Sequence, residues 1–340
     1  MTIDIAVTGV SGAIGARLLA HLEADAHVGR IVGFDQKEPD HRSRKLEFHC
    51  VDLGTVDLKP LLDGVDVIVH LAGVASPILD VELMARINVE GTRRVLDAAA
   101  AVGVSRVVRL SSASVYGAWP NNPVPLTEDA PLRPNGGFAP AAQAAEIERM
   151  LAEWRHDHPS TTVVVLRAAP VIGADNFVMR ILQSRPTLRV RGVSPAVQVV
   201  HADDVASALA LAVTDLDGVY NLGADGWLSS EEAAALVPRG VLPALPTEVL
   251  ERLLGATWRS GIGEIPPSVL PYVTNSWVVA NDRLRAAGWT PTYTNAEALV
   301  VGVDDAHATP ERYAVLAGAA VTVLAVGAVT WAVLRHLRRS

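Results

Sequence analysis

The strongest sign of the fold lies near the N-terminus, where a glycine-rich turn follows a short apolar stretch. Ile3–Thr8 has the composition of a buried strand, and a segment with helical spacing begins within the sequence Gly9-Val10-Ser11-Gly12-Ala13-Ile14-Gly15. In a strand-turn-helix unit of this kind, the first glycine permits a tight turn, the second lets the backbone approach a pyrophosphate, and the third lets helix and strand pack closely. The pattern therefore predicts that this turn, including Ser11, Ala13 and Ile14, binds a dinucleotide.

An acidic residue lies where such a site needs one. Asp35 follows the second predicted strand, 20 residues beyond Gly15. A carboxylate at this point accepts hydrogen bonds from the adenosine ribose hydroxyls and repels a 2′-phosphate, which favours NAD over NADP. The alternative interpretation is a structural glycine turn that binds nothing.

Short apolar runs alternate with helical segments along the first half of the chain. The expected strands are 3–8, 30–34, 46–51, 65–71, 104–110 and 161–166. The expected helices are 14–23, one or two helices within 81–102, and 140–156. This alternation predicts an α/β fold, a Rossmann-type doubly wound parallel sheet with helices on both faces. We expect residues 1–167 to form this domain. The proline-rich residues 168–300 should form a smaller C-terminal substrate lobe interwoven with it.

The end of the chain has a different composition. After an expected linker, 301–312, the 22 residues of Tyr313–Leu334 carry no charge. As a helix they would span roughly 33 Å, enough for a bilayer core, so a C-terminal transmembrane helix is predicted. Without a signal peptide, the expectation is a single-pass protein of the cell membrane with its large domain in the cytoplasm. The basic tail, 335–340, favours the opposite orientation, and a helix that does not fully cross is the alternative.

Overall composition excludes some classes of function. Half of the residues are hydrophobic, 19% are charged and the net charge is −8. A nucleic-acid-binding protein usually presents a basic face, so no nucleic-acid partner is expected. The single cysteine has no histidine or cysteine neighbours at zinc-ligand spacing, so no metal site is predicted either.

Further motifs resemble one family. They are Asp52-Leu53, His70-Leu71-Ala72-Gly73, Asn88–Thr92, Ser111–Gly117, Arg167 with Pro170–Gly173, His201–Ala206 and Leu284–Pro291. With the Gly-x-x-Gly-x-x-Gly spacing, they resemble the extended short-chain dehydrogenase/reductases, the NAD-dependent epimerase/dehydratase group, over residues 1–300. The resemblance implies a catalytic hydroxyl at Ser112. It also implies cofactor contacts by Asp52, Leu53, Leu71, Ala72, Gly73, Asn88, Pro170 and Val171.

The chain departs from this family at its acid/base pair. Family members use a tyrosine with a lysine four residues later, because an unperturbed tyrosine titrates near 10 and needs a nearby cation. Counted from the Ser111–Gly117 motif, with Glu146 as the family's glutamate, these positions hold Phe138 and Ala142. The last lysine of the chain is Lys59. The usual mechanism is therefore absent, and Ser112 with Tyr116 is the remaining catalytic candidate.

The predicted substrate region departs from the family as well. Members that act on nucleotide sugars resemble one another in an arginine four residues before the lobe histidine, where this chain has Val197. The nearby arginines that could serve instead are Arg180, Arg185, Arg189 and Arg191. A lipid-like small molecule is the expected ligand, and a second copy of the chain or a membrane protein is the expected partner.

Two main functions stay open at this point. One is a divergent NAD-dependent epimerase/dehydratase or oxidoreductase. The other is a non-catalytic, membrane-anchored NAD-binding sensor or scaffold. A third hypothesis is a purely structural subunit of a membrane complex. Fold alone does not separate them.

Overall fold

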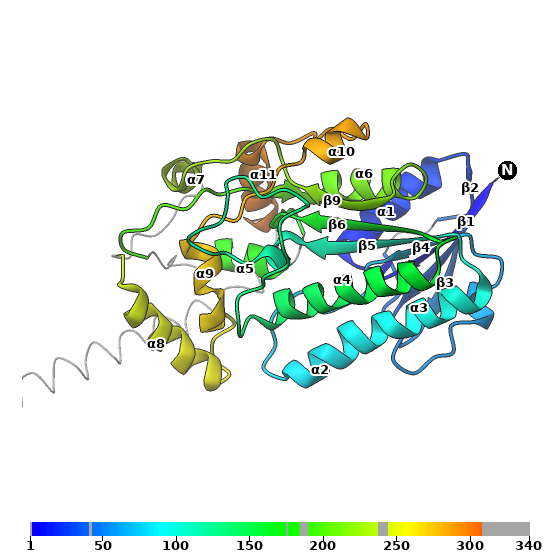
Figure 1. Ribbon diagram of the computed structural model, residues 1–340, viewed down its shortest axis with the longest axis horizontal. Helices are drawn as coiled ribbons and strands as arrows, with labels where there is room; N and C mark the ends of the chain where they lie inside the picture. The colour runs from blue at the N-terminus through cyan, green and yellow to red at the C-terminus, as the bar shows by residue number, and fades with distance from the viewer. Residues whose placement is uncertain (1, 41–42, 175, 184–189, 237–243, 308–340) are drawn as a thin grey trace, which may run out of the picture.

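The computed structural model describes residues 2–40, 43–174, 176–183, 190–236 and 244–307. A seven-stranded sheet in the order β3-β2-β1-β4-β5-β6-β9 forms its centre (Figure 1). The strands are β1 (Ile3–Thr8), β2 (Val28–Asp35), β3 (Leu46–Cys50), β4 (Val67–His70), β5 (Arg106–Ser112), β6 (Thr162–Ala168) and β9 (Gly218–Leu222). Every neighbouring pair is parallel, which confirms the predicted Rossmann-type parallel sheet.

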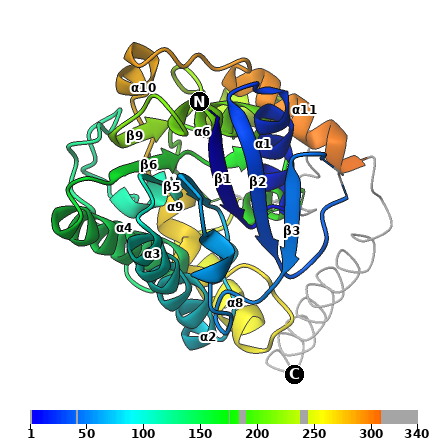
Figure 2. The ribbon, with the colours of Figure 1, turned by 90° about the vertical axis from the view of Figure 1, so that its right-hand side faces the viewer.

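Helices cover both faces of the sheet (Figure 2). One face carries α1 (Ala13–Ala24) and α6 (Ala202–Ala212), and the other carries α3 (Gly91–Val102) and α4 (Ala139–Asp157). A short helix, α2 (Val81–Ala85), and a π-helical turn, η2 (Arg86–Glu90), lead into α3. Because side chains alternate along a strand, neighbours on one strand enter opposite cores.

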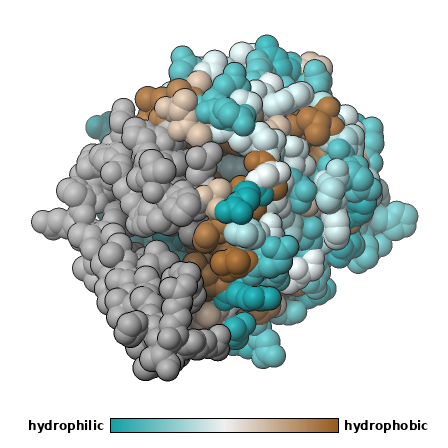
Figure 3. Space-filling model, turned by 90° about the vertical axis from the view of Figure 1, so that its left-hand side faces the viewer, coloured by the Kyte–Doolittle hydropathy of each residue, from teal (hydrophilic) through white to brown (hydrophobic). Residues whose placement is uncertain are grey.

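Most of the remaining elements lie beyond the carboxyl ends of the strands, whereas the helix Asp282–Ala286 packs beside β9 (Figure 1). The remaining elements are β7 (Val171–Ile172), α5 (Phe177–Gln183), β8 (Val200–His201), α7 (Ser230–Leu236), α8 (Thr247–Arg259), η4 (Pro267–Val269), α9 (Leu270–Thr274), α10 (Asp282–Ala286) and α11 (Asn295–His307). Two of them, β7 and β8, form a second, two-stranded parallel sheet. Figure 3 views this end of the molecule and shows apolar side chains gathered at the surface near the middle of the face.

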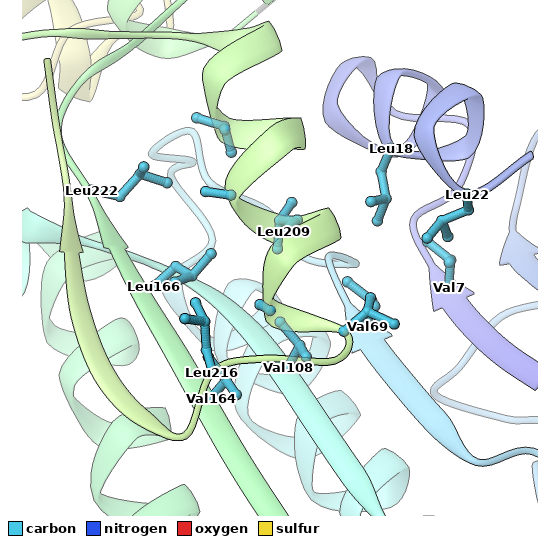
Figure 4. Packing of buried hydrophobic residues seen from close by; sticks show 14 of the residues in the cluster. Val7, Leu18, Leu22, Val69, Val108, Val164, Leu166, Leu209, Leu216 and Leu222 are labelled. Atoms are coloured by element: carbon cyan, nitrogen blue, oxygen red, sulfur yellow. The ribbon is translucent and has the colours of Figure 1, made fainter. Parts of the chain in front are cut away.

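The larger core joins the sheet to α1 and α6 (Figure 4). Leu18 and Leu22 of α1 and Leu209 of α6 pack against Val69 and Val108 of the central strands, and all five are at most 3% exposed. Each such side chain contributes roughly 1.5–3 kcal/mol when it is fully buried. This packing fixes the carboxyl edge of β1, β4 and β5, where the predicted site residues lie.

The predicted transmembrane helix is wrong for the part of the chain that the structure describes. Within that part, no helix combines the length and the apolar character needed to cross a bilayer. The longest one, α4, has 19 residues and carries charged side chains such as Glu146 and Arg149. The segment 313–334 and the tail 335–340 lie outside the described residues. The location in the cell membrane, which was inferred from that segment alone, is corrected with it.

Candidate active site

Backbone crowding explains the glycines of the turn after β1. Gly9 has a φ of +74°, and a Cβ built on it would lie 2.8 Å from the backbone nitrogen of Ala72. A Cβ on Gly15 would lie 2.3 Å from the carbonyl oxygen of Gly9. Gly12 is the N-cap of α1 and offers no side-chain cap, so the first N–H groups of the helix, from Ala13 and Ile14 onward, remain available to an anion.

Asp35, the last residue of β2, is tied to this turn. Its Oδ2 accepts a hydrogen bond from the backbone N–H of Ser11 at 3.0 Å, and its Oδ1 accepts one from the N–H of Gln36 at 2.7 Å. The hydroxyl of Ser11 donates to the carbonyl oxygen of Lys37. Each carboxylate oxygen accepts further bonds, so Asp35 can hold the turn and still accept from a ligand hydroxyl.

A buried histidine orders the loop after β4. The N–H of Ala72 donates to Thr8 Oγ1, which is hydrogen-bonded to His70 Nδ1 at 2.6 Å. His70 Nε2 then donates to Thr92 Oγ1, which itself donates to the carbonyl oxygen of Asn88. Burial, and to a smaller extent the charge of Arg109, holds the pKa of His70 well below its usual range. The ring is therefore neutral.

Asn88, in η2, clamps the same loop from the helix side. Its Oδ1 accepts from the N–H of Val74 at 2.7 Å, and its Nδ2 donates to the Val74 carbonyl oxygen at 3.0 Å. Nδ2 also donates to Oε1 of Gln143 on α4 at 2.9 Å. Leu71, Gly73 and Asn88 accordingly line one cavity.

Ser112 and Tyr116 lie near each other in the sequence but contact different partners. Ser112 lines the cavity, and its Oγ accepts the N–H of Ser114 at 3.2 Å. The intervening turn, η3 (Ala113–Tyr116), carries Tyr116 into the core, where it is 1% exposed. Its hydroxyl donates to Asn221 Oδ1 at 2.7 Å and accepts from Arg167 at 2.7 Å. Burial raises the pKa of Tyr116 to about 12, opposite to the shift that a base acting near neutral pH needs.

Glu148 of α4 and Arg167 of β6 form an ion pair under this part of the site. Arg167 Nη2 lies 2.7 Å from Glu148 Oε2, and the two side chains are 7% and 4% exposed. The other carboxylate oxygen accepts the hydroxyl of Ser111 at 2.5 Å. The pair fixes α4 against β5 and β6, and no motif in the sequence marks Glu148 as part of the site.

Phe138 and Ala142 occupy different environments. Phe138 is 7% exposed and packs on Tyr272 and Phe177, with ring centroids 5.0 and 6.3 Å away. Ala142 is exposed and does not belong to the described residues that line the cavity. These two positions therefore do not face the cavity together.

The cavity face of α4 lies two residues further along. Pro140 and Ala144 line the cavity, four residues apart, and Glu148 follows after four more. Glu146, in contrast, is exposed. The Ala-rich sequence of this helix start gives no hydrophobic pattern that would have revealed which face turns inward.

Tyr272 of α9 is a cavity residue for which the sequence offered no signal. Its hydroxyl donates to the carbonyl oxygen of Ser114 at 3.0 Å and accepts from the N–H of Asn135 at 3.3 Å. Burial raises its pKa to about 12. Like Tyr116, this phenol is held as a structural hydrogen-bonding group.

The cavity measures about 580 Å³ and continues from the ends of β4 and β5 into the smaller lobe. Pro170 and Val171, for which cofactor contacts were predicted, line the cavity. On the lobe side its walls are largely apolar, for example Phe177, Ile181, Leu250, Leu254, Val269 and Trp277. Arg109 of β5 is the charged side chain among the described residues that line it.

Of the candidate replacements for an arginine at Val197, Arg180 and Arg191 do not belong to the described residues that line the cavity. Val197 itself lines the cavity. Arg180 contacts Ser76 and Glu264, and Arg191 donates to the Ala244 carbonyl oxygen. Arg185 and Arg189 lie outside the described residues.

The predicted adenine contacts sit on the loop after β3. Asp52 is exposed, and its Oδ1 accepts the N–H of Gly54 at 2.8 Å. Leu53 is half-buried against the core beneath α3. Both residues lie on the Asp35 side of the sheet, beside β2.

Known proteins share this architecture. An uncharacterized protein of Mycobacterium tuberculosis is 28% identical over 310 residues, which cover 86% of this chain and 81% of that protein. MoeE5 in complex with UDP-glucuronic acid and NAD matches with a TM-score of 0.71 at 21% identity, over 90% of this chain and 99% of its own. UDP-glucose 4-epimerase of Thermus thermophilus in complex with NAD matches with a TM-score of 0.69 at 23% identity, over 89% and 98%.

The family assignment rests on the sequence. The sequence model of the NAD dependent epimerase/dehydratase family matches residues 5–223, which is more than half of the chain. The resemblance found from the motifs is confirmed by this match. The chain belongs to the NAD dependent epimerase/dehydratase family.

Proposed function

We propose that this protein binds NAD across the carboxyl edge of the sheet, with the pyrophosphate at the glycine turn and the adenosine ribose at Asp35. The main support is the hydrogen bond from the Ser11 N–H to Asp35 Oδ2. It holds the Asp35 carboxylate, which can accept hydrogen bonds from ribose hydroxyls, next to the N-terminus of α1, which can bind a pyrophosphate. The close approach of Gly9 and Gly15 to the backbone fits a turn built for a ligand. The family and the NAD-containing neighbours support the same cofactor.

The preference for NAD over NADP rests on charge. A 2′-phosphate would place a second anion against the Asp35 carboxylate. The two oxygens of this carboxylate accept hydrogen bonds from the backbone N–H groups of Ser11 and Gln36, so the side chain cannot rotate away from the phosphate without losing these bonds. Like charges at this distance repel. NADP should therefore bind more weakly than NAD.

The cavity beside this site fits a small, mostly apolar molecule, which includes lipid-like compounds. MoeE5 was solved with UDP-glucuronic acid, a ligand with two phosphate groups. Here the lobe side of the cavity is largely apolar, and Val197 is part of its wall. Desolvating a diphosphate against such a surface is unfavourable.

We propose that a secondary alcohol of this molecule would give a hydride to the bound cofactor and become a ketone, while its hydroxyl proton passes to water. Bound NAD supplies the hydride acceptor. Ser112 Oγ accepts the Ser114 N–H, and its own O–H has no partner among the described residues, so it is available to a substrate oxygen. If Glu148 instead of Glu146 is taken as the family's glutamate, the comparison with the family shifts by two residues. Pro140 and Ala144 then occupy the tyrosine and lysine positions, so neither alignment restores the acid/base pair. Turnover should be about 10²–10⁴-fold slower than with a positioned acid/base.

The second candidate function is NAD binding without turnover, as a sensor of redox state or as a scaffold. It is favoured by Pro140 and Ala144, which give α4 neither a proton donor nor a cation at the cavity.

A turnover assay separates these candidates. The full chain would be incubated with NAD and either long-chain secondary alcohols or a UDP-sugar. NADH formation would be followed by absorbance, and conversion of the UDP-sugar, which leaves no net NADH when the hydride returns to the sugar, would be followed by chromatography. NADH formed from an apolar alcohol, and lost in Ser112→Ala, supports hydride exchange. NAD binding without any reduction supports the sensor. Turnover of the UDP-sugar alone would overturn the apolar substrate.

A further inference from the structure

Arg109 points into the cofactor half of the cavity from β5. Its Nη1 donates to the carbonyl oxygens of His70 at 2.9 Å and Ala72 at 3.3 Å. Its Nη2 would lie 3.8 Å from a Cβ built on Gly73. Neither Nε nor Nη2 has a hydrogen-bond partner among the described residues, and the side chain lines the cavity. Two sides of the guanidinium are therefore available to a ligand.

This cation also lacks a counterion within the described part of the chain. The carboxylate that acts on it is Glu148, which is already bound to Arg167 and to Ser111. Burial lowers the pKa of Arg109 to about 10, so it still carries its charge at neutral pH. A partly buried charge without a partner is costly to the fold, and in proteins such groups commonly serve a bound ligand.

The sheet topology indicates which part of a bound dinucleotide would lie next to Arg109. The strand order reverses between β1 and β4, and a dinucleotide lies across that reversal. Asp35, on β2, marks the adenosine half. The nicotinamide half therefore lies over β4 and β5, where Arg109 is. Arg109 and Ala144 of α4 line the same cavity.

We propose that Arg109 is a cofactor-binding residue that donates hydrogen bonds to the hydroxyls of the ribose carrying the nicotinamide. In this arrangement β5 supplies the cation that α4 does not. Ribose hydroxyls suit the free N–H groups, because a guanidinium presents several donors in a fixed plane. This inference rests on the proposed NAD site.

Truncated ligands test which half of the cofactor Arg109 contacts. Calorimetric titrations of the full chain with NAD, ADP-ribose and ADP would compare the wild type with Arg109→Met, Arg109→Lys and Asp35→Asn. Arg94→Met, at an exposed arginine of α3, is the matched control. We expect Arg109→Met to weaken NAD and ADP-ribose at least about tenfold, the usual effect of losing a charged hydrogen bond, and to change ADP less than about twofold. Asp35→Asn should weaken all three.

The outcomes separate the two proposals. Unchanged NAD and ADP-ribose affinity in Arg109→Met, with Asp35→Asn still weakening all ligands, would overturn the role of Arg109 alone. Equal weakening of ADP and ADP-ribose would overturn it too. A wild type that binds none of the three would overturn the NAD site and this inference with it. If Arg109→Met does not fold, the ratio of ADP-ribose to ADP affinity in Arg109→Lys decides: a ratio below the wild-type value supports the proposal, and an unchanged ratio contradicts it.

Discussion

Replacing Arg167 with methionine measures how strongly α4 is held on the sheet. The change removes the 2.7 Å ion pair to Glu148 and the bonds from Nη1 to Tyr116 and to the carbonyl oxygen of Glu128. Of the interactions described for the Glu148 carboxylate, which is 4% exposed, only the hydrogen bond from the Ser111 hydroxyl then remains. Removing one partner of a buried pair costs about 3–5 kcal/mol, because the other charge stays buried without compensation.

Urea denaturation of the full chain, followed by circular dichroism, gives the change in the free energy of unfolding. The double variant Glu148→Met/Arg167→Met removes both charges and should be more stable than Arg167→Met by at least about 2 kcal/mol. If Arg167→Met costs less than about 1 kcal/mol, or if the double variant is no more stable than Arg167→Met, the pair does not hold α4 as described.

Three further changes have defined outcomes. Gly15→Ala places a Cβ 2.3 Å from the Gly9 carbonyl oxygen, so it should destabilise the fold by about 1–3 kcal/mol and weaken NADH binding, checked by thermal melting and fluorescence titration. Tyr116→Phe leaves Asn221 without its donor, so it should cost about 1–3 kcal/mol in urea while NADH affinity stays unchanged; a large loss of affinity would instead give Tyr116 a direct role. His70 has a folded-state pKa below its unfolded value, so stability is fully present above about pH 6.5 and falls as the pH drops below it, by up to about 1.4 kcal/mol per pH unit. His70→Gln should flatten that slope in urea midpoints measured from pH 7 to pH 5.

The cofactor end of the fold could be predicted because its signals are local in the sequence. The spacing of Gly9, Gly12 and Gly15, and of Asp35 beyond them, reflects one strand-turn-helix unit and the strand after it. The structure places Asp35 on the Ser11 N–H, a contact consistent with that spacing. Alternating apolar runs similarly predicted the parallel sheet.

The chemistry of the cavity could not be predicted in the same way. Arg109 looks like an isolated polar residue in an apolar strand, and its partners His70 and Ala72 are 39 and 37 residues away. The 3₁₀ turn between Ser112 and Tyr116 directs the Tyr116 side chain away from Ser112, and the residue pattern of this segment does not predict that direction.

The transmembrane prediction used one property, the absence of charge over 313–334, and took no account of tertiary structure. The described part of the chain gives it no support. Uncharged helices also occur in protein cores, so a lack of charge does not by itself identify a membrane span.

The central claim, a working NAD site built on Asp35 and the glycine turn, is tested most directly by NADH fluorescence titration of the full chain. Wild type, Asp35→Ala and the exposed control Asp97→Ala would be compared. We expect a Kd on the order of micromolar, weakened about tenfold or more in Asp35→Ala and unchanged in Asp97→Ala. Absence of NADH binding to the wild type, or equal affinity in all three proteins, would contradict it.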